Sequence, residues 1–158
     1  MPRPYIPRET AKIYDLQNPE KQMSKSLAGP GCVFLLDPVS ASAKKIRSAV
    51  TDTGREIRYD VAAKPGVSNL LVIHSALSGR PVPELEADYE GKGYGDLKKD
   101  VAGVLTDFLA PVQAAVAGYL DDPAELDKVL ASGAERARSV AAQTLRTAYD
   151  RVGFLPPS

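Results

Sequence analysis

The chain has 158 residues, the length of one ordinary domain, and carries 20 basic and 20 acidic side chains. The zero formal charge excludes nucleic-acid binding by a strongly basic whole, so any RNA site must be a local patch. The single cysteine, Cys32, excludes an intrachain disulfide and is typical of a reducing compartment, so we expect a cytoplasmic protein. No apolar run approaches the roughly 18 residues of a membrane span, and we expect no membrane association.

Two short strands are predicted near the N-terminus, with a polar loop between them. The first covers Ala11–Asp15 and ends at the turn-forming pair Asn18-Pro19. The second is the apolar run 32–36, where periodicity alone allows a strand or one turn of core helix and we favour the strand. The loop between them, 20–31, contains Gly29-Pro30-Gly31, which bars both helix and regular strand, so we expect it to be mobile.

From Ser40 onward the apolar residues recur at spacings of three and four, which predicts helices. We expect helices over 40–51, 67–77, 83–89 and 97–112, the last kinked at Pro111, followed by one that begins after Asp122 and ends at Gly153. The last helix is expected to bury one face, formed by Leu126, Val129, Leu130, Val140, Leu145, Ala148 and Tyr149. His74 lies at helical spacing from Leu70 and Leu77, which favours a packed side chain over a catalytic base or metal ligand, and no metal ligands are predicted.

The stretch with the most specific chemistry is Met23-Ser24-Lys25-Ser26. It places one cation between two hydroxyls in a loop flanked by glycines and prolines. Such a loop can close over a triphosphate and put its donors where charge develops on the leaving pyrophosphate. Four residues alone are a weak signal, and a solvated loop would be the simpler interpretation.

The flanking sequence makes the signal specific. The loop resembles the KMSKS signature of class I aminoacyl-tRNA synthetases, and the residues before it, 11–19, resemble the tryptophanyl-tRNA synthetases in particular. Further stretches are similar to that family in the same order, namely 44–52, 57–60, 64–71, 93–99 and 149–154.

This resemblance implies a mainly α fold. It implies a short α/β remnant of the class I nucleotide-binding fold with the KMSKS-like loop over 1–36, and a helical tRNA anticodon-binding domain over 37–158. It also implies the parent reaction, in which ATP, with Mg²⁺, and tryptophan give tryptophanyl-adenylate and pyrophosphate before the amino acid is transferred to tRNA(Trp). The parent enzyme is expected to be a homodimer, and no DNA is expected as a partner.

The resemblance carries site residues over to four positions. Lys25 would be catalytic and contact the pyrophosphate, Ser24 and Ser26 would donate hydrogen bonds, and Met23 would pack near the adenine, so Met23 to Ser26 form the expected ATP site. The first signature position, normally lysine, is Gln22 here, with Lys21 beside it. The other class I signature, a His-x-Gly-His sequence, does not occur, because the only histidine is His74 and Ser75 follows it.

Lysine and arginine side chains elsewhere are weaker candidates for contacts with tRNA phosphates. They lie in two groups, Lys44, Lys45 and Arg47 in the first and Lys98 and Lys99 in the second. A solvated helix face is as good an interpretation for the first group and a better one for the second.

The leading interpretation is the C-terminal part of a tryptophan-tRNA ligase, and three alternatives stay open for its role. It could work with a separate N-terminal half, act as a non-catalytic tRNA-binding paralogue, or be an inert remnant. We expect the isolated chain to be inactive and to hold no tightly bound cofactor, because the first class I signature and the tryptophan pocket are not among its residues.

Overall fold

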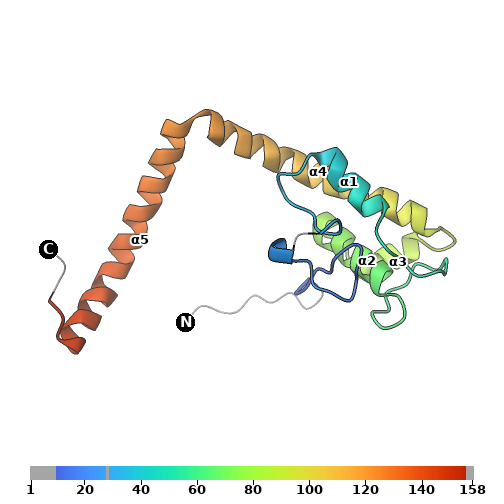
Figure 1. Cartoon of the computed structure of the whole chain (residues 1–158), viewed down its shortest axis with the longest axis horizontal. Coiled ribbons are helices and arrows are strands. Elements are labelled where there is room, and N and C mark those ends of the chain that lie inside the picture. The colour runs from blue at the N-terminus through green and yellow to red at the C-terminus, as the bar shows by residue number, and fades with distance from the viewer. Residues whose placement is uncertain (1–9, 28, 156–158) are drawn as a thin grey trace. The chain divides into compact units, whose positions relative to one another are not determined.

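The computed structural model describes residues 10–27 and 29–155, and the regular elements of this part are all helices (Figure 1). They are a short 3₁₀ turn, η1, and five α-helices. Their bounds are η1 Lys25–Leu27, α1 Val39–Arg47, α2 Pro65–Ser78, α3 Val82–Asp88, α4 Tyr94–Asp121 and α5 Pro123–Val152. The predicted mainly helical fold is therefore confirmed.

The two predicted strands are wrong, since the described residues contain no regular strand. Ala11–Asp15 contributes only an isolated antiparallel bridge between Tyr14 and Gln22. The run 32–36 is irregular, because the turn at Gly29–Gly31 and Asp37-Pro38 leave it too short to build a ladder and no strand lies beside it among the described residues. Cys32 is nevertheless buried, as its apolar surroundings in the sequence suggest.

Helix α2 is the centre of the core. Pro65 occupies its first turn, and Gly79 ends it in the left-handed conformation with φ 73°. Every residue from Gly66 to His74 is buried, so the helix is enclosed on all sides. Apolar side chains from α1, α3, α4 and residue Leu16 complete this core. His74 is only 6 % exposed and packs edge-on against Tyr89 with ring centroids 6.3 Å apart, which confirms the predicted structural role.

Helix α1 ends earlier than predicted. Its regular hydrogen bonds stop at Arg47, and the Val50 amide donates to the Leu16 carbonyl at 2.7 Å instead of continuing the helix. The predicted helix end near residue 51 is thus wrong, because a tertiary hydrogen bond to the N-terminal segment replaces the last turn.

Helix α4 continues through Pro111 to Asp121. By length and composition it could cross a membrane, although, as expected, it contains no uninterrupted apolar run of about 18 residues. Core helices of folded domains pass the same test. The first half of α4 buries Leu97, Val101, Leu105 and Leu109 within the core around α2, whereas no residue after Leu109 is buried in this helix.

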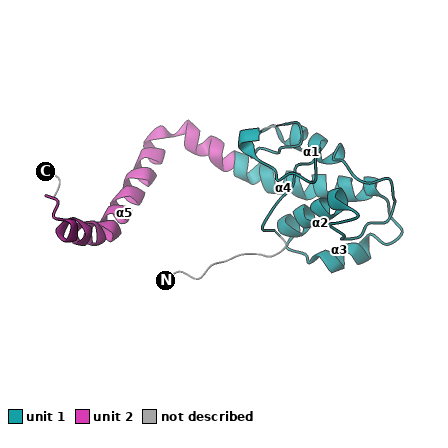
Figure 2. Cartoon of the chain, turned by 60° about the horizontal axis from the view of Figure 1, so that its bottom comes forward, with its two compact units in different colours: residues 1–113 teal, residues 114–158 magenta. Residues whose placement is uncertain are grey.

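The chain divides into two compact units, Met1–Gln113 and Ala114–Ser158 (Figure 2). The first unit holds η1, α1, α2, α3 and most of α4, and with them the whole core described above. The N-terminal segment that was expected to be a remnant of another fold packs into this same unit, since Leu16 is 2 % exposed among the core residues.

The second unit contains the end of α4 and helix α5. The Asp122 carboxylate accepts a hydrogen bond from the Glu125 amide at 3.1 Å, and Gly153 closes the helix at φ 80°, as predicted. The predicted core face is wrong, because no residue of α5 is buried and Val140 is 79 % exposed. An apolar stripe is buried only when another element covers it, and nothing in the described part of this unit does so.

Candidate functional site

The signature loop, residues 20–31, belongs to the first unit, and the structure describes all of it except residue 28. Met23 is half-buried and packs against the core, whereas Lys25 and Ser26 are exposed at the start of η1. The hydroxyl oxygens of Ser24 and Ser26 lie 3.2 Å apart on either side of Lys25. These two hydroxyls are hydrogen-bonded to each other, so the loop presents one ammonium and one free hydroxyl donor from a base fixed by Met23.

Backbone hydrogen bonds tie the two arms at the base of the loop. The Asp15 amide donates to the Lys21 carbonyl at 2.8 Å, and the Met23 amide donates to the Ile13 carbonyl at 2.9 Å. These bonds flank the bridge between Tyr14 and Gln22. Gln22, the position where the signature normally has lysine, is thus part of the base and is exposed.

A tight turn follows the first arm. The Asp15 carboxylate accepts hydrogen bonds from the amides of Gln17 (2.8 Å) and Asn18 (3.0 Å). Gly31 lies directly against this carboxylate and the Gln17 amide, so a Cβ at position 31 would collide with both. The Gly31 carbonyl also accepts from the Leu16 amide at 3.0 Å, which closes the loop where it rejoins the core.

One helix side chain holds the middle of the first arm. Asn69 of α2 accepts a hydrogen bond from the Tyr14 amide at 2.9 Å and donates one to the Tyr14 carbonyl at 2.8 Å. The sequence reasoning missed this residue. The available signal was an amide side chain between Val67 and Leu70 in an apolar helix, because a buried polar group requires partners.

The first predicted group of tRNA-binding residues lies in the last turn of α1. Lys44 and Arg47 are exposed there. Lys45 instead turns inward, where it pairs with Asp37 at 2.7 Å, donates to the Cys32 carbonyl at 2.7 Å and lies over the Phe34 ring. Lys45 therefore joins the run after the signature loop to α1.

The second predicted group, at the start of α4, is also divided. Lys98 donates to the Thr51 hydroxyl at 3.3 Å, and burial lowers the pKa of its ammonium. Lys99 is exposed and lines a hollow with Asp100 and Asp107. Lys25 lies in η1, whereas the two predicted tRNA-binding groups lie in α1 and α4, so the predicted ATP and tRNA residues are on three different elements.

A polar cluster that the sequence reasoning did not single out joins three segments. Lys64 donates to Tyr94 at 2.9 Å and to Asp52 at 3.3 Å, and the Tyr94 hydroxyl donates to the same Asp52 oxygen at 2.6 Å. Partial burial of Asp52 opposes its ionisation, but the hydrogen bonds from Tyr94, Gly54 and Lys64 outweigh this effect and hold the pKa of Asp52 below its ordinary value. The hydrogen bond to Tyr94 raises the pKa of Lys64, so the pair stays charged.

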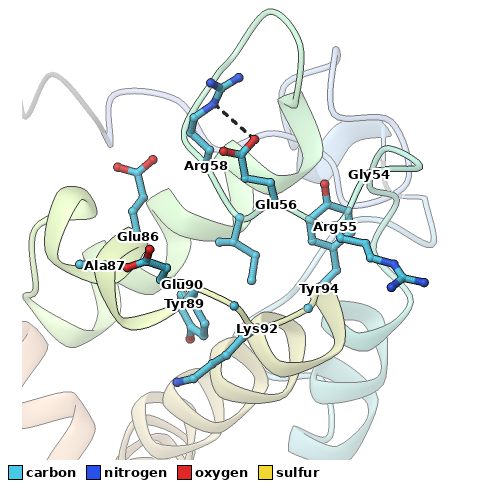
Figure 3. Close-up of a pocket in the computed structure, with 13 residues that line it drawn as sticks. Gly54, Arg55, Glu56, Arg58, Glu86, Ala87, Tyr89, Glu90, Lys92 and Tyr94 are labelled. Atoms are coloured by element: carbon cyan, nitrogen blue, oxygen red, sulfur yellow. Dashed lines mark ion pairs between the residues drawn. The ribbon is translucent and has the colours of Figure 1, made fainter.

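Next to this cluster lies a hollow with a volume of about 840 Å³, whose lining residues are drawn in Figure 3. Its walls come from residues 54–58 on one side and from residues 86–94 on the other. Both signs of charge line it, with Arg55, Arg58 and Lys92 among three glutamates, and Arg58 faces Glu56 at 4.0 Å. Gly91, Gly93 and the first residue of α4, Tyr94, belong to this wall, and the glycine segment connects α3 to α4.

The donors of the signature loop suit phosphate oxygens, because an ammonium and hydroxyls are hydrogen-bond donors. They are not ligands of Mg²⁺, which prefers carboxylate and water oxygens. No group of three or more His, Cys, Asp or Glu side chains converges in residues 10–27 and 29–155. What this loop can do chemically is stabilise negative charge on a phosphate chain.

The sequence of the chain matches one family of known proteins. The family described as "tRNA synthetases class I (W and Y)" matches residues 5–110. The chain is 59 % identical over 157 residues to tryptophan--tRNA ligase 2 of Streptomyces avermitilis, covering 99 % of this chain and 47 % of that protein. It is 54 % identical to the tryptophan--tRNA ligase of Corynebacterium efficiens, covering 99 % of this chain and 46 % of the relative.

Solved structures agree with the sequence comparison. The tryptophanyl-tRNA synthetase of Mycoplasma pneumoniae superposes with a TM-score of 0.85 at 33 % identity, covering 94 % of this chain and 45 % of that one. A structure of the Campylobacter jejuni enzyme complexed with ADP and tryptophan gives a TM-score of 0.62 at 25 % identity, over 91 % of this chain and 44 % of that one. The chain thus spans about half the length of the relatives it matches. It belongs to the class I tRNA synthetases of the tryptophan and tyrosine group.

Proposed function

We propose that this chain supplies the ATP-side loop and the tRNA-facing helices of a tryptophan-tRNA ligase, as its C-terminal part. The observation that carries the proposal is the loop itself, whose Lys25 and Ser26 are exposed while Met23 fixes the base to the core. The high identity to tryptophan--tRNA ligases along almost the whole chain supports tryptophan as the amino acid.

In the proposed reaction Lys25 acts as a point charge on the pyrophosphate oxygens. Ser24 and Ser26, whose hydroxyls lie 3.2 Å apart, donate hydrogen bonds to the same phosphate chain. Donors of this kind lower the barrier because charge on the leaving group increases in the transition state. Met23 packs near the adenine, and Mg²⁺ enters with ATP, held by the phosphates rather than by this loop.

The domain boundary stays as proposed from the sequence, with residues 1–36 serving the ATP side and residues 37–158 serving tRNA(Trp). The exposed side chains of Lys44, Arg47 and Lys99 support a phosphate-facing role better than those of Lys45 and Lys98, which have partners inside the chain. The parent enzyme acts as a homodimer in the cytoplasm.

The test is complementation with a separately expressed N-terminal half, which would carry the His-x-Gly-His signature and the tryptophan pocket. We expect charging of tRNA(Trp) with the mixture and none with either half alone. Tryptophan-dependent exchange of labelled pyrophosphate into ATP by this chain alone would contradict the expected inactivity of the isolated part. Mixtures that never charge tRNA would exclude the split-enzyme form of the proposal.

A non-catalytic tRNA-binding module is the second candidate, and the exposed side chains of Lys44 and Arg47 on α1, outside the signature loop, favour it. The hollow beside the polar cluster does not favour it, because Glu56, Glu86 and Glu90 balance Arg55, Arg58 and Lys92 there. Filter binding with tRNA(Trp) and competing tRNAs distinguishes the candidates. Selective binding of tRNA(Trp), without charging in the complementation assay, supports the module. Absence of binding to both tRNA(Trp) and the competing tRNAs supports an inert remnant.

A further inference from the structure

Asn69 of α2 connects this helix to the base of the signature loop, because both polar atoms of its side chain bond to the backbone of one residue, Tyr14. Asn69 is 4 % exposed, and its amide oxygen and nitrogen bond to the amide and carbonyl of Tyr14 at 2.9 and 2.8 Å. A neighbouring strand makes this pair of bonds in a sheet. Here the Asn69 side chain replaces the neighbouring strand, and its two hydrogen bonds go to the backbone of Tyr14 and not to the Tyr14 side chain.

Tyr14 is the central residue of the loop base. The residues on either side of it, Ile13 and Asp15, bond to Met23 and Lys21 on the returning arm. Any displacement of the Tyr14 backbone therefore moves both arms together. Met23, the first residue of the candidate ATP site, moves with them.

Helix α2 is a rigid support for this contact. One residue before Asn69, the Ser68 hydroxyl accepts a hydrogen bond from the Asp60 amide at 2.9 Å. At the preceding end of the helix Gly66 lies directly against the Val50 carbonyl, and Lys64 bonds to Asp52 and Tyr94. The start of α2 is thus fixed to three segments of the unit, and Asn69 extends this fixed frame to the loop.

We propose that Asn69 is a positioning residue. It determines where the four residues of the candidate ATP site, Met23 to Ser26, lie relative to α2. The proposal rests on the proposed ATP-side role of the loop. Asn69 does not touch a reacting group, and it acts through Tyr14. Substitution of Asn69 should therefore change how the loop meets ATP and leave the tryptophan side of the reaction unchanged.

The first experiment measures loop position directly in this 158-residue chain. Asn69→Leu keeps the approximate size of the side chain and removes both of its hydrogen bonds to Tyr14. We therefore expect the amides of Tyr14, Leu16 and Met23 to exchange with solvent at least about tenfold faster. Val72→Ala is the control, because Val72 is 5 % exposed on the same helix and beside the same hollow as Tyr14. Asn69→Ala, which removes the same two hydrogen bonds without placing an apolar group against the Tyr14 carbonyl, should also accelerate exchange and serves if the leucine variant does not fold.

The second experiment measures the KM for ATP and for tryptophan in the complemented enzyme. Asn69→Leu should raise the KM for ATP, leave the KM for tryptophan unchanged and exceed the effect of Val72→Ala. Equal amide exchange in Asn69→Leu and Val72→Ala, or acceleration spread evenly over α4, would overturn the proposal whatever the activity. If the mixture never charges tRNA, the proposed function fails while amide exchange still decides the role of Asn69.

Discussion

The hydroxyl of Tyr94, the first residue of α4, donates a 2.6 Å hydrogen bond to the carboxylate of Asp52, 42 residues earlier in the chain. Lys64 bonds to both partners, so three segments meet at one cluster. Tyr94→Phe keeps the ring and removes the hydroxyl. We expect the free energy of unfolding to fall by about 1 to 2 kcal/mol, because Asp52 and Lys64 each lose a partner in a partly buried site.

The control for that substitution is Tyr119→Phe, on the same helix. Tyr119 is 49 % exposed, and substitutions at such positions change stability by less than about 0.5 kcal/mol. Urea unfolding of both variants checks the prediction. Equal midpoints would show that the cluster contributes nothing to stability.

Two helical glycines should respond oppositely to alanine. A Cβ at Gly66 would collide with the Val50 carbonyl, whereas nothing lies within 4 Å of the corresponding position at Gly103. Gly66→Ala should therefore lower the free energy of unfolding by about 1 to 3 kcal/mol. Gly103→Ala should raise it by up to about 1 kcal/mol, because alanine favours a helix interior more than glycine does. Thermal melts of the two variants give the signs directly.

The only histidine makes stability dependent on pH in a window where no other side chain ordinarily titrates. Burial lowers the pKa of His74, with Arg80 acting in the same direction and Asp100 and Asp88 opposing it. The neutral ring is favoured in the folded state, so this contribution is complete above the unfolded pKa of about 6.5 and is lost as the pH falls through the lower folded pKa. We expect urea midpoints to fall from pH 7.5 to 5.5, and His74→Gln to flatten this dependence. A midpoint that rises on acidification would contradict the assignment.

Lys25 should matter for activity and not for folding. Its side chain is exposed, so Lys25→Ala should leave the free energy of unfolding within about 0.5 kcal/mol of the original. In the complemented enzyme the same substitution should slow tryptophan activation by about 100 to 1,000 fold, the typical effect of removing one charge-stabilising donor. Lys128→Ala, at an exposed lysine of α5, is the matched control and should retain full activity. An equal loss in both variants would mean that general charge, and not the loop, is responsible.

The apolar side chains of the two long helices should differ in their contribution to stability. Leu97 of α4 is fully buried and Leu130 of α5 is 60 % exposed. Leu97→Ala should lower the free energy of unfolding of the first unit by about 2 to 5 kcal/mol, and Leu130→Ala should have little effect. Amide exchange should likewise be faster along α5 than along α2, because few buried contacts protect it. Strong protection of α5 would indicate that its apolar face is covered in solution.

The helices could be predicted from the sequence because their signals are local. Pro65 and Gly79 around α2, and Asp122 and Gly153 around α5, act on the backbone within one turn of where they stand. The position of Lys25 between two serines is also a sequence feature, and the structure places it in an exposed loop.

The sequence-based predictions failed where contacts with residues far away in the sequence determine the local structure. The run 32–36 has a strand-like composition, yet strand formation needs a neighbour that a short window cannot reveal. Lys45 looked like a surface cation and instead bonds to Asp37 and the Cys32 carbonyl, and Asn69 meets Tyr14 across 55 residues. Helix α5 shows the opposite error, since its periodic apolar residues predict a buried face that the described chain does not cover.

Between Gly66 and His74, α2 is buried, and Ser68, Asn69 and Val72 line a small hollow beside Tyr14. Substitutions at the other positions of this stretch would therefore change the surface indirectly, by shifting the segments that α2 contacts. Two of these segments are held by hydrogen bonds, at Tyr14 through Asn69 and at Asp60 through Ser68. One buried helix thus positions two surface segments that lie 46 residues apart in the sequence.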